Sequence, residues 1–266
     1  MGDKKKLLLL DGHALAYRAY HAIPPLTTPE GEPSNATFGF ANILLKAIAD
    51  VQPDYVIATF DSGRTFRHET YDQYKATRAQ TPDDLRPQLA RIYQLVDTLG
   101  IPVLVKEGYE ADDLLGTLAA QASAQGLETV IATGDSDTFQ LISDDVRVLY
   151  PQRTVGDTKL YDREAVRERY HGLTPEQLVD YKALVGDPSD NIPGVSGIGD
   201  KTATKLLQQY GSLEGIYAHL DEITPARTRA ALEQGRQAAE MSRNLVRIVR
   251  EVPDVRLDTQ SGTWGH

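Results

Sequence analysis

Acidic side chains at the spacing of a metal site are the first chemically suggestive feature of this chain. Three carboxylates fall within four positions of the stretch GYEADDLLGTLAAQ, which turns apolar directly after them. One of them could be a helix N-cap, which is worth about 0.3 to 1 kcal/mol. A helix start has room for one such cap, and two carboxylates about 4 Å apart repel by roughly 4 kcal/mol at an effective dielectric near 20. We therefore expect Glu110, Asp112 and Asp113 to need bound cations.

More acids follow the apolar runs that we predict to be strands. These runs cover residues 6–12, 55–63, 101–113 and 129–137, and a fifth covers 146–151. For a single acid after a strand, N-capping is the simpler explanation. The carboxyl ends of parallel strands meet at one sheet edge, however, where ligands bind. With two acids from VGDPSDNIPG, nine carboxylates are predicted to converge there: Asp11, Asp61, Glu110, Asp112, Asp113, Asp135, Asp137, Asp187 and Asp190.

The ligand types in this set indicate which cation it would hold. The donors are oxygens, the chain has no cysteine, and only His13 lies near any of the acids in sequence. Such a set favours Mg²⁺ or Mn²⁺ over zinc. Nine carboxylates exceed the needs of one octahedral ion, so we expect two or three ions. Paired ions of this kind clamp the attacking and leaving oxygens of a phosphodiester.

The elements that must position these residues alternate between strand and helix in the first part of the chain. Helical periodicity at residues 35–50, 82–98 and 112–125 predicts an α/β domain whose mostly parallel central sheet is flanked by helices.

Beyond residue 160 the pattern changes to short helices. In LTPEQLVDYKALVG, Thr174 and Gln177 form a predicted capping box and Gly186 ends the helix. Further helices are expected near 200–210, 212–219 and 225–251. We predict two domains, an α/β core at 1–165 and a helical subdomain at 166–266.

A glycine hairpin in the second half is a predicted phosphate site. The stretch DNIPGVSGIGDKTATKLL places a tight turn before a helix start, and exposed N–H groups there bind anions such as a DNA backbone phosphate. The alternative is an ordinary helix–turn–helix connection with Gly after the first helix. The residues expected to contact DNA are Gly194, Gly197, Gly199, Lys201 and Thr202.

A locally basic segment at 63–88 interrupts an otherwise acidic protein. From Arg64 to Arg91 there are six Lys or Arg against four acids, with aromatic residues between them. Aromatic side chains can stack on unpaired bases while Lys and Arg, Arg67 among them, meet phosphates. A solvated helix face is the alternative. We also expect Arg18 to reach a phosphate.

The composition is that of an ordinary globular protein. The hydrophobic fraction is 41%, and the formal net charge of −10, taken alone, argues against a nucleic-acid partner. Bound divalent ions could offset nearly all of that excess. The run KKKLLLLDG is too short for a signal peptide or a membrane span, so we expect a cytoplasmic protein without membrane contact. Phe38 and Phe40 are predicted to be core residues.

Five collinear blocks across residues 7–207 resemble the flap endonuclease family, in particular the N-terminal 5′ nuclease (5′-3′ exonuclease) domain of bacterial DNA polymerase I. They are LLLLDGHALAYRAYHA, ATFDSGRTFRHETYDQYKATR, GYEADDLLGTLA, GDSDTFQL and LVGDPSDNIPGVSGIGDKTATKLL. The resemblance implies a metal-dependent hydrolase that cuts 5′ flaps, nicks and RNA-primer ends on branched or duplex DNA during replication and repair. One departure is Ser136, where GDKD is the commoner form.

Residue roles follow from the resemblance by motif. The first metal would fall to Asp11, Asp61, Glu110 and Asp112, and the second to Asp113, Asp135, Asp137, Asp187 and Asp190. Tyr74, Lys75 and Arg78 match the family's helical arch, expected at about 64–98, where Lys and Arg face the scissile phosphate. The hairpin from Gly194 to Lys201 matches its helix-hairpin-helix, which holds the duplex and can bind K⁺.

The ending VRLDTQSGTWGH resembles the point where polymerase I continues into its next domain. A covalently linked polymerase and a free-standing monomeric nuclease are both open at this point. Two other functions also remain: a non-catalytic module that binds branched DNA, and a related ribonuclease.

Overall fold

The chain forms two compact units in a computed structural model that describes residues 4–152 and 157–265. The first unit comprises Met1–Thr65, Gln80–Asp162 and Ile248–His266, and the second comprises Phe66–Ala79 and Arg163–Arg247. The predicted division after residue 165 therefore differs from the structure in two segments. Residues 66–79 belong with the helical unit, and residues 248–266 belong with the sheet.

A six-stranded sheet is the centre of the first unit, as its described residues show, with the order β3-β2-β1-β4-β5-β6. The first five strands are parallel and β6, which the sequence analysis did not predict, is an antiparallel edge. This confirms the predicted mostly parallel sheet. The strands are β1 (Lys6–Asp11), β2 (Tyr55–Thr59), β3 (Val103–Leu104), β4 (Glu128–Ala132), β5 (Val146–Pro151) and β6 (Thr158–Tyr161).

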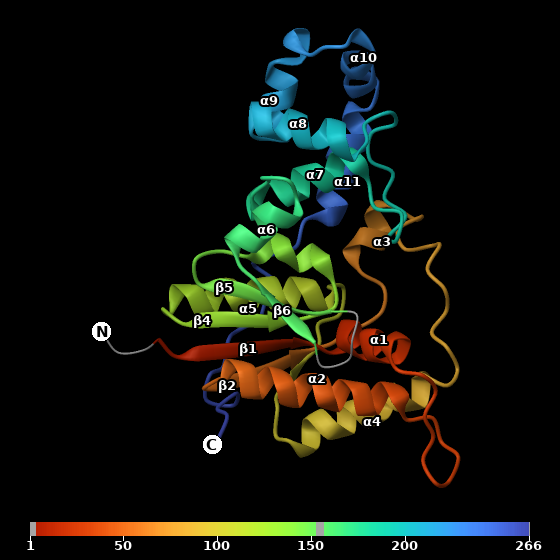
Figure 1. The fold of residues 1–266 in the computed structure, drawn as a ribbon, viewed down its shortest axis with the longest axis vertical. Coiled ribbons are helices and arrows are strands. Elements are labelled where there is room, and N and C mark those ends of the chain that lie inside the picture. The colour runs from red at the N-terminus through yellow and green to blue at the C-terminus, as the bar shows by residue number, and fades with distance from the viewer. Residues whose placement is uncertain (1–3, 153–156, 266) are drawn as a thin grey trace. The chain divides into compact units, whose positions relative to one another are not determined.

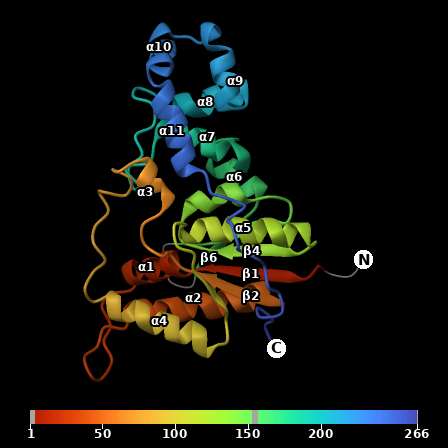
Figure 2. The same ribbon diagram turned by 180° about the vertical axis from the view of Figure 1, so that it is seen from behind.

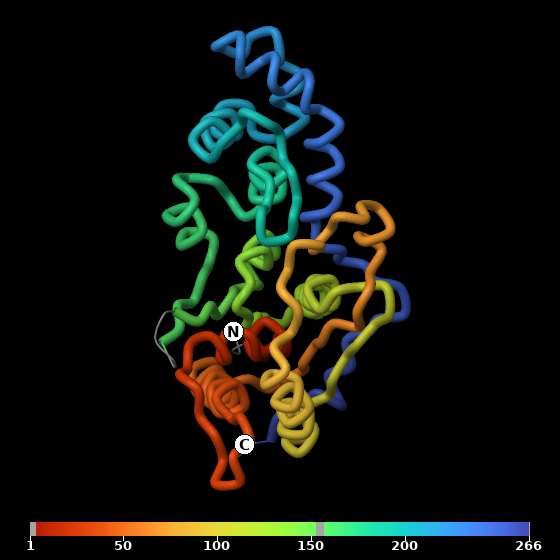
Figure 3. The backbone as a smooth tube through the Cα atoms, turned by 90° about the vertical axis from the view of Figure 1, so that its right-hand side faces the viewer, coloured from red at the N-terminus to blue at the C-terminus, as the bar shows by residue number. Residues whose placement is uncertain are grey.

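Helices cover both faces of this sheet, which is why the central strands are apolar throughout. Helices α2 and α4 lie side by side on one face, and α5 lies on the other (Figures 1 and 3). Phe40 is fully buried in this core, but Phe38 is 55% exposed, so the prediction that Phe38 is a core residue is wrong. Residues two apart on a helix point about 200° apart. The helical segments are α1 (Gly12–Ala22), α2 (Asn35–Val51), α4 (Arg86–Thr98), α5 (Ala111–Ala124) and η1 (Ser136–Leu141).

The strand order reverses between β1 and β4. From β1 the chain passes through α1 and α2 to β2, on one side, whereas α5 leads back to β4, on the other side. Loops beyond the carboxyl ends of two such strands diverge and leave a crevice. Asp11, which ends β1, and Asp135, which follows β4, therefore lie at the switch point of the sheet.

The C-terminal segment returns to the sheet instead of extending the last helix. It passes along α5 and then meets β2, as Figure 2 shows for the blue end of the chain. The N–H of Val56 donates to the carbonyl of Gly262 at 2.8 Å, and the N–H of Trp264 donates to that of Asp54 at 2.8 Å. The predicted helix at 225–251 is therefore too long at its end.

The second unit is helical, as predicted. The capping box of Thr174 and Gln177 is confirmed, and Gly186, at φ 83°, ends α7. Gly235 separates α10 from α11, where a Cβ would lie 2.6 Å from Val195. The segments are α3 (Phe66–Thr70), α6 (Arg163–Arg169), η2 (Pro175–Gln177), α7 (Leu178–Val185), α8 (Asp200–Tyr210), α9 (Leu213–Ala218), η3 (Leu220–Glu222), α10 (Ala226–Gln234) and α11 (Arg236–Val246).

Arg67 caps the end of α11 within this unit. Its side chain is 2% exposed, its Nε donates to the carbonyl of Leu245 at 2.8 Å, and its Nη2 donates to that of Arg247 at 2.8 Å. These carbonyls lie at the end of the helix, where backbone C=O groups have no N–H donor within the helix itself. The guanidinium is thus inside the unit rather than on a DNA-facing surface, which corrects its predicted role.

We expect Arg67→Met to destabilise the second unit by about 3 kcal/mol, because the carbonyls of Leu245 and Arg247, the first of them in a buried hydrogen bond, lose their donors. Urea unfolding followed by circular dichroism measures this. Arg227→Met, an exposed change on α10, is the matched control and should have an effect below about 0.5 kcal/mol. Equal stability of the two variants would contradict the capping role.

No helix in the described part of the chain is long and apolar enough to cross a membrane.

Candidate metal centre

Asp11 ends β1 and caps α1. Its carboxylate accepts the N–H of Ala14 at 3.0 Å and the hydroxyl of Thr133 at 2.6 Å, and the residue is 3% exposed. Thr133 follows β4, the strand beside β1. Burial, and then the charges of Asp61 and Asp135, raise the pKa of Asp11 to about 7. The sequence analysis missed Thr133, although its place directly after an apolar strand was a usable signal.

The start of α5 holds the acids of the GYEADD stretch. Glu110 and Asp113 form a reciprocal capping box, so the expectation that a helix start satisfies only one of these acids is wrong. Asp112 lies between them in sequence and has different surroundings. Burial, followed by the charges of Asp135, Asp11, Glu110 and Asp137, raises the pKa of Asp112 well above its ordinary value.

Asp61 follows β2 and is held by the backbone of α5. Its Oδ1 accepts the N–H of Ala111 at 2.8 Å, while its own N–H donates to Nδ1 of His13 at 3.1 Å. Burial lowers the pKa of His13, which keeps Nδ1 available as an acceptor. The Asp61 side chain remains 45% exposed, so it faces solvent.

Asp135 and Asp137 come from the segment after β4. Asp135 caps η1 by accepting the N–H of Asp137 at 2.9 Å, and its own N–H donates to Thr133 at 3.0 Å. Both side chains are partly exposed. The charges of these two acids act on Asp112, so the structure brings acids from three separate chain segments into one electrostatic cluster.

The donor set of this cluster fits a hard divalent ion that keeps part of its water. All of the oxygens are carboxylate, which is the ligand type of Mg²⁺ and Mn²⁺. Within the described residues, no three His, Asp or Glu side chains lie close enough to one another to hold a metal ion by themselves. Mg²⁺ is commonly bound through one or two carboxylates and several waters, so an open set of this kind suits it.

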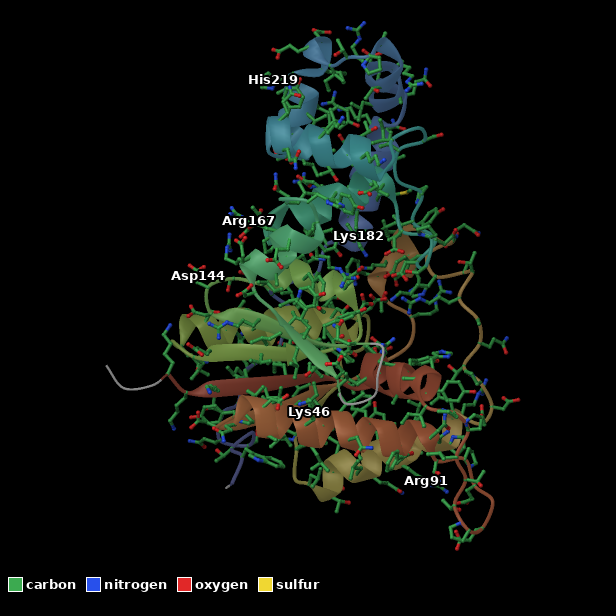
Figure 4. The ribbon with its side chains drawn as sticks, in the orientation of Figure 1. Lys46, Arg91, Asp144, Arg167, Lys182 and His219 are labelled. Atoms are coloured by element: carbon green, nitrogen blue, oxygen red, sulfur yellow. The ribbon has the colours of Figure 1, made fainter. Side chains whose placement is uncertain are left out.

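Asp187 and Asp190 lie in the second unit and are paired with cations there. Asp187 accepts from Lys182 of α7 (labelled in Figure 4) at 2.7 Å and from the N–H of Ser189 at 2.9 Å. Burial opposes ionisation of Asp187, but these partners outweigh it and lower its pKa. Asp190 is 6% exposed and accepts from Arg78 Nε at 3.0 Å. Their roles as metal ligands stay predictions.

The segment 66–79, part of the predicted arch, is helical only at its start. Only Phe66–Thr70 is helical, and turns follow up to Arg78. Tyr74 is 3% exposed and its hydroxyl donates to Asp190 at 3.2 Å, so it packs inside the unit, where no base can stack on it. Lys75 has a left-handed backbone at φ 56°, and its Nζ lies 3.8 Å from Asp190.

The glycine hairpin between α7 and α8 divides into a packed part and an open part. A Cβ on Gly194 would lie 2.3 Å from the nitrogen of Gly186, so this glycine permits close backbone contact inside the unit. Gly197 is exposed at φ 84°, and Gly199, the N-cap of α8, has nothing within 4 Å of its Cβ position. Lys201 is exposed and Thr202 half-buried in the first turn.

Arg18 of α1 is half-buried and donates to the backbone carbonyl of Gln152. This contact holds the guanidinium to its own unit, and its predicted phosphate contact stays a prediction.

The fold and the site define an α/β protein with acidic side chains crowded together at the switch point of its sheet. Residues 6–171 match the model of the 5′-3′ exonuclease N-terminal resolvase-like domain, and residues 173–263 match that of the 5′-3′ exonuclease C-terminal SAM fold. The chain therefore belongs to the 5′-3′ exonuclease family and contains both of these domains. This confirms the resemblance and the predicted enzyme class.

The chain is similar to a part of several DNA polymerases I. It is 51% identical to that of Chloroflexus aurantiacus over 263 residues, which cover 97% of this chain and 28% of that protein. It is 47% identical to the thermostable enzyme of Thermus thermophilus, covering 94% and 29%. The chain thus spans less than a third of the length of these relatives.

Solved structures share the fold. The 5′-exonuclease of bacteriophage T5 with bound zinc ions has a TM-score of 0.77 at 21% identity, covering 92% of this chain and 90% of that one. The catalytic core of Rad2 in complex with DNA has a TM-score of 0.61 at 16% identity, covering 98% and 83%.

Proposed function

We propose that this chain is a metal-dependent, structure-specific nuclease. It hydrolyses phosphodiesters at 5′ flaps, nicks and RNA-primer ends of duplex DNA during replication and repair. The observation that carries this proposal is the crowding around Asp112, whose pKa is raised by burial and by four other carboxylates. Such a cluster is costly without divalent ions and suited to holding them.

The residues proposed to hold two or three Mg²⁺ or Mn²⁺ ions are those of the first unit's cluster. The bound ions would supply a water of lowered pKa and neutralise charge on the phosphate. The protein fixes the carboxylates in advance, since Thr133 and the N–H of Ala14 hold Asp11 and the N–H of Ala111 holds Asp61. The proposed ligands are Asp11, Asp61, Glu110, Asp112, Asp135 and Asp137.

The second unit is proposed to supply positive charge and DNA contacts. Lys75 and Arg78 would stabilise charge on the scissile phosphate. The open part of the hairpin would hold the duplex backbone through Gly197, Gly199 and Lys201, and its carbonyls could take K⁺. Support comes from the T5 exonuclease with divalent ions and from Rad2 with a DNA substrate.

The wider setting is also a proposal. The relatives are DNA polymerases I of which this chain covers 28–29%, which supports a covalently linked polymerase in the full-length protein. We propose a monomer that works in the cytoplasm.

Cleavage of a 5′-labelled flap duplex in Mg²⁺ tests the proposal. We expect products cut near the base of the flap, and none in EDTA. DNA binding without cleavage in Mg²⁺ and in Mn²⁺ would overturn the nuclease in favour of a binding module. A faster rate on an all-RNA strand than on flapped DNA would instead indicate a ribonuclease.

Lys201→Ala should weaken binding to flap DNA similarly for all sequences, because the side chain would contact a phosphate. The slope of log K against log salt should become less steep by about 0.9, one phosphate contact. Fluorescence anisotropy in EDTA, where cleavage is blocked, measures this. Lys205→Ala, an exposed change one turn further along α8, is the matched control and should leave the slope unchanged. Identical slopes for wild type and Lys201→Ala would contradict the hairpin contact.

A further inference from the structure

One face of α5 carries polar side chains that bind the C-terminal segment. Asp113, Thr117 and Gln121 are spaced by four residues and so lie in a row along the helix. Each accepts a backbone N–H from the segment that follows α11. The bonds run from Val249 to Asp113 at 2.8 Å, from Val252 to Thr117 at 3.0 Å, and from Leu257 to Gln121 at 2.7 Å.

The same face of α5 is shaped for close contact with this segment. A Cβ on Gly116 would lie 2.8 Å from Ile248 and 3.0 Å from the carbonyl oxygen of Val249, so only glycine lets the segment lie this near. Gln121 also donates to the carbonyl of Val255 at 2.9 Å. The segment from Ile248 to Leu257, here called the C-terminal strap, is thus fixed to the helix that carries Glu110 and Asp112.

Asp113 joins this row to the acid cluster. It is 0% exposed, its Oδ1 accepts the N–H of Val249, and its Oδ2 accepts the N–H of Glu110 at 3.1 Å. Asp112 points about 100° away around the helix, toward Asp135 and Asp11, whose charges act on it. Adjacent acids of the same stretch therefore face different surroundings.

We propose that Asp113 is a positioning residue and not a metal ligand. Its carboxylate ties the strap to the backbone at Glu110, and this fixes the first turn of α5, from which Glu110 and Asp112 project. The predicted assignment of Asp113 to the second metal is thereby replaced. The inference rests on the proposed function, because Glu110 and Asp112 are the metal ligands that Asp113 would position. The hydrogen bonds from the N–H groups of Val249 and Glu110 to Asp113 form without any ion.

The test compares Asp113→Asn with Asp112→Asn in EDTA and in Mn²⁺. In EDTA, Asp113→Asn should lower Tm by about 3–8 °C, because an amide NH₂ replaces an acceptor facing an N–H. Hydrogen exchange should show lost protection of the Val249 amide. In Mn²⁺, the number of bound ions should equal that of wild type, with affinity reduced by about 10- to 100-fold and an altered Mn²⁺ spectrum in electron paramagnetic resonance. Asp112→Asn should not lower Tm in EDTA, because it removes a repelled charge, and it should lose Mn²⁺ binding.

Thr117→Val separates positioning from simple support of the fold. It removes the next bond to the strap, one turn further from the acids, and should lower Tm and expose the Val252 amide while leaving the Mn²⁺ spectrum unchanged. If Asp113→Asn kept its Tm in EDTA and bound one ion fewer, it would be a ligand and the proposal would be overturned. An unchanged Mn²⁺ spectrum in Asp113→Asn would also overturn it, leaving only a structural role. Absence of Mn²⁺ binding by wild type would refute the proposed function. The EDTA measurements would still show whether the hydrogen bonds that Asp113 accepts stabilise the protein.

Discussion

Asp112→Asn is expected to reduce cleavage of a 5′-flap duplex by about 10³-fold or more in Mg²⁺. Its carboxylate lies where the charges of four other acids meet, so it is the side chain best placed to share a bound ion. An asparagine keeps the shape but removes the charge that attracts the ion. Single-turnover cleavage measures the loss, and DNA affinity in EDTA should stay at the wild-type value.

The same substitution should stabilise the metal-free protein. The raised pKa of Asp112 means that folding disfavours its charged form. This cost is present at pH 8, well above the ordinary pKa of a carboxyl group, and disappears as the pH falls to that ordinary value and the group is protonated in both the folded and the unfolded state. In EDTA, Asp112→Asn should therefore raise Tm at pH 8 and have little effect at pH 4.

Asp97→Asn is the matched control for both measurements, since Asp97 is an exposed acid on α4 outside the cluster. It should leave cleavage and metal-free stability near wild type. Retained cleavage by Asp112→Asn would remove the central support for the metal site. If Asp112→Asn lowered Tm in EDTA at pH 8, the Asp112 carboxylate would not be repelled by its neighbours.

Lys75→Ala is the substitution with the next largest expected effect, a loss of about 10²-fold in turnover with little change in KM. The side chain is 21% exposed, and its ammonium lies 4.9 Å from the ring centre of Tyr74 and 3.8 Å from Asp190. A preorganised cation of this kind stabilises charge that develops on a phosphate in the transition state. Single-turnover rates at saturating enzyme isolate the chemical step.

Lys46→Ala provides the control for loss of a lysine elsewhere. Lys46, labelled in Figure 4, pairs with Asp50 on the surface of α2, and its loss should leave turnover unchanged. Lys75→Arg, which keeps the charge, should recover part of the rate. If Lys75→Ala weakened binding but left turnover intact, its role would be a positioning contact with DNA.

The sequence was most informative where structure follows from local patterns. Apolar runs predicted β1, β2, β4 and β5, the capping box marked the start of η2, and Gly186 marked the end of α7. It was least informative where a distant segment decides a residue's role. By sequence, Arg67 is a basic residue that could contact a phosphate. In the structure it caps α11 by donating to carbonyls about 180 positions away.

The two adjacent acids Asp112 and Asp113 show the same limit. By sequence both are carboxylates at a helix start, and nothing local separates them. The partner that distinguishes Asp113 is the N–H of Val249, which lies 136 positions further along the chain. A backbone N–H carries no side-chain signature, so this pairing could not be predicted from the sequence.

By itself the sequence determined that acids gather at one edge of a parallel sheet, because strand periodicity and the strand-end acids are local properties and parallel pairing aligns the carboxyl ends. Only the tertiary structure decided which of them are crowded, as Asp112 is, and which are held by backbone amides, as Asp113 is. The physical reason is that a carboxylate's environment depends on the segments packed around it. Those segments are brought together by folding and lie far apart in the chain.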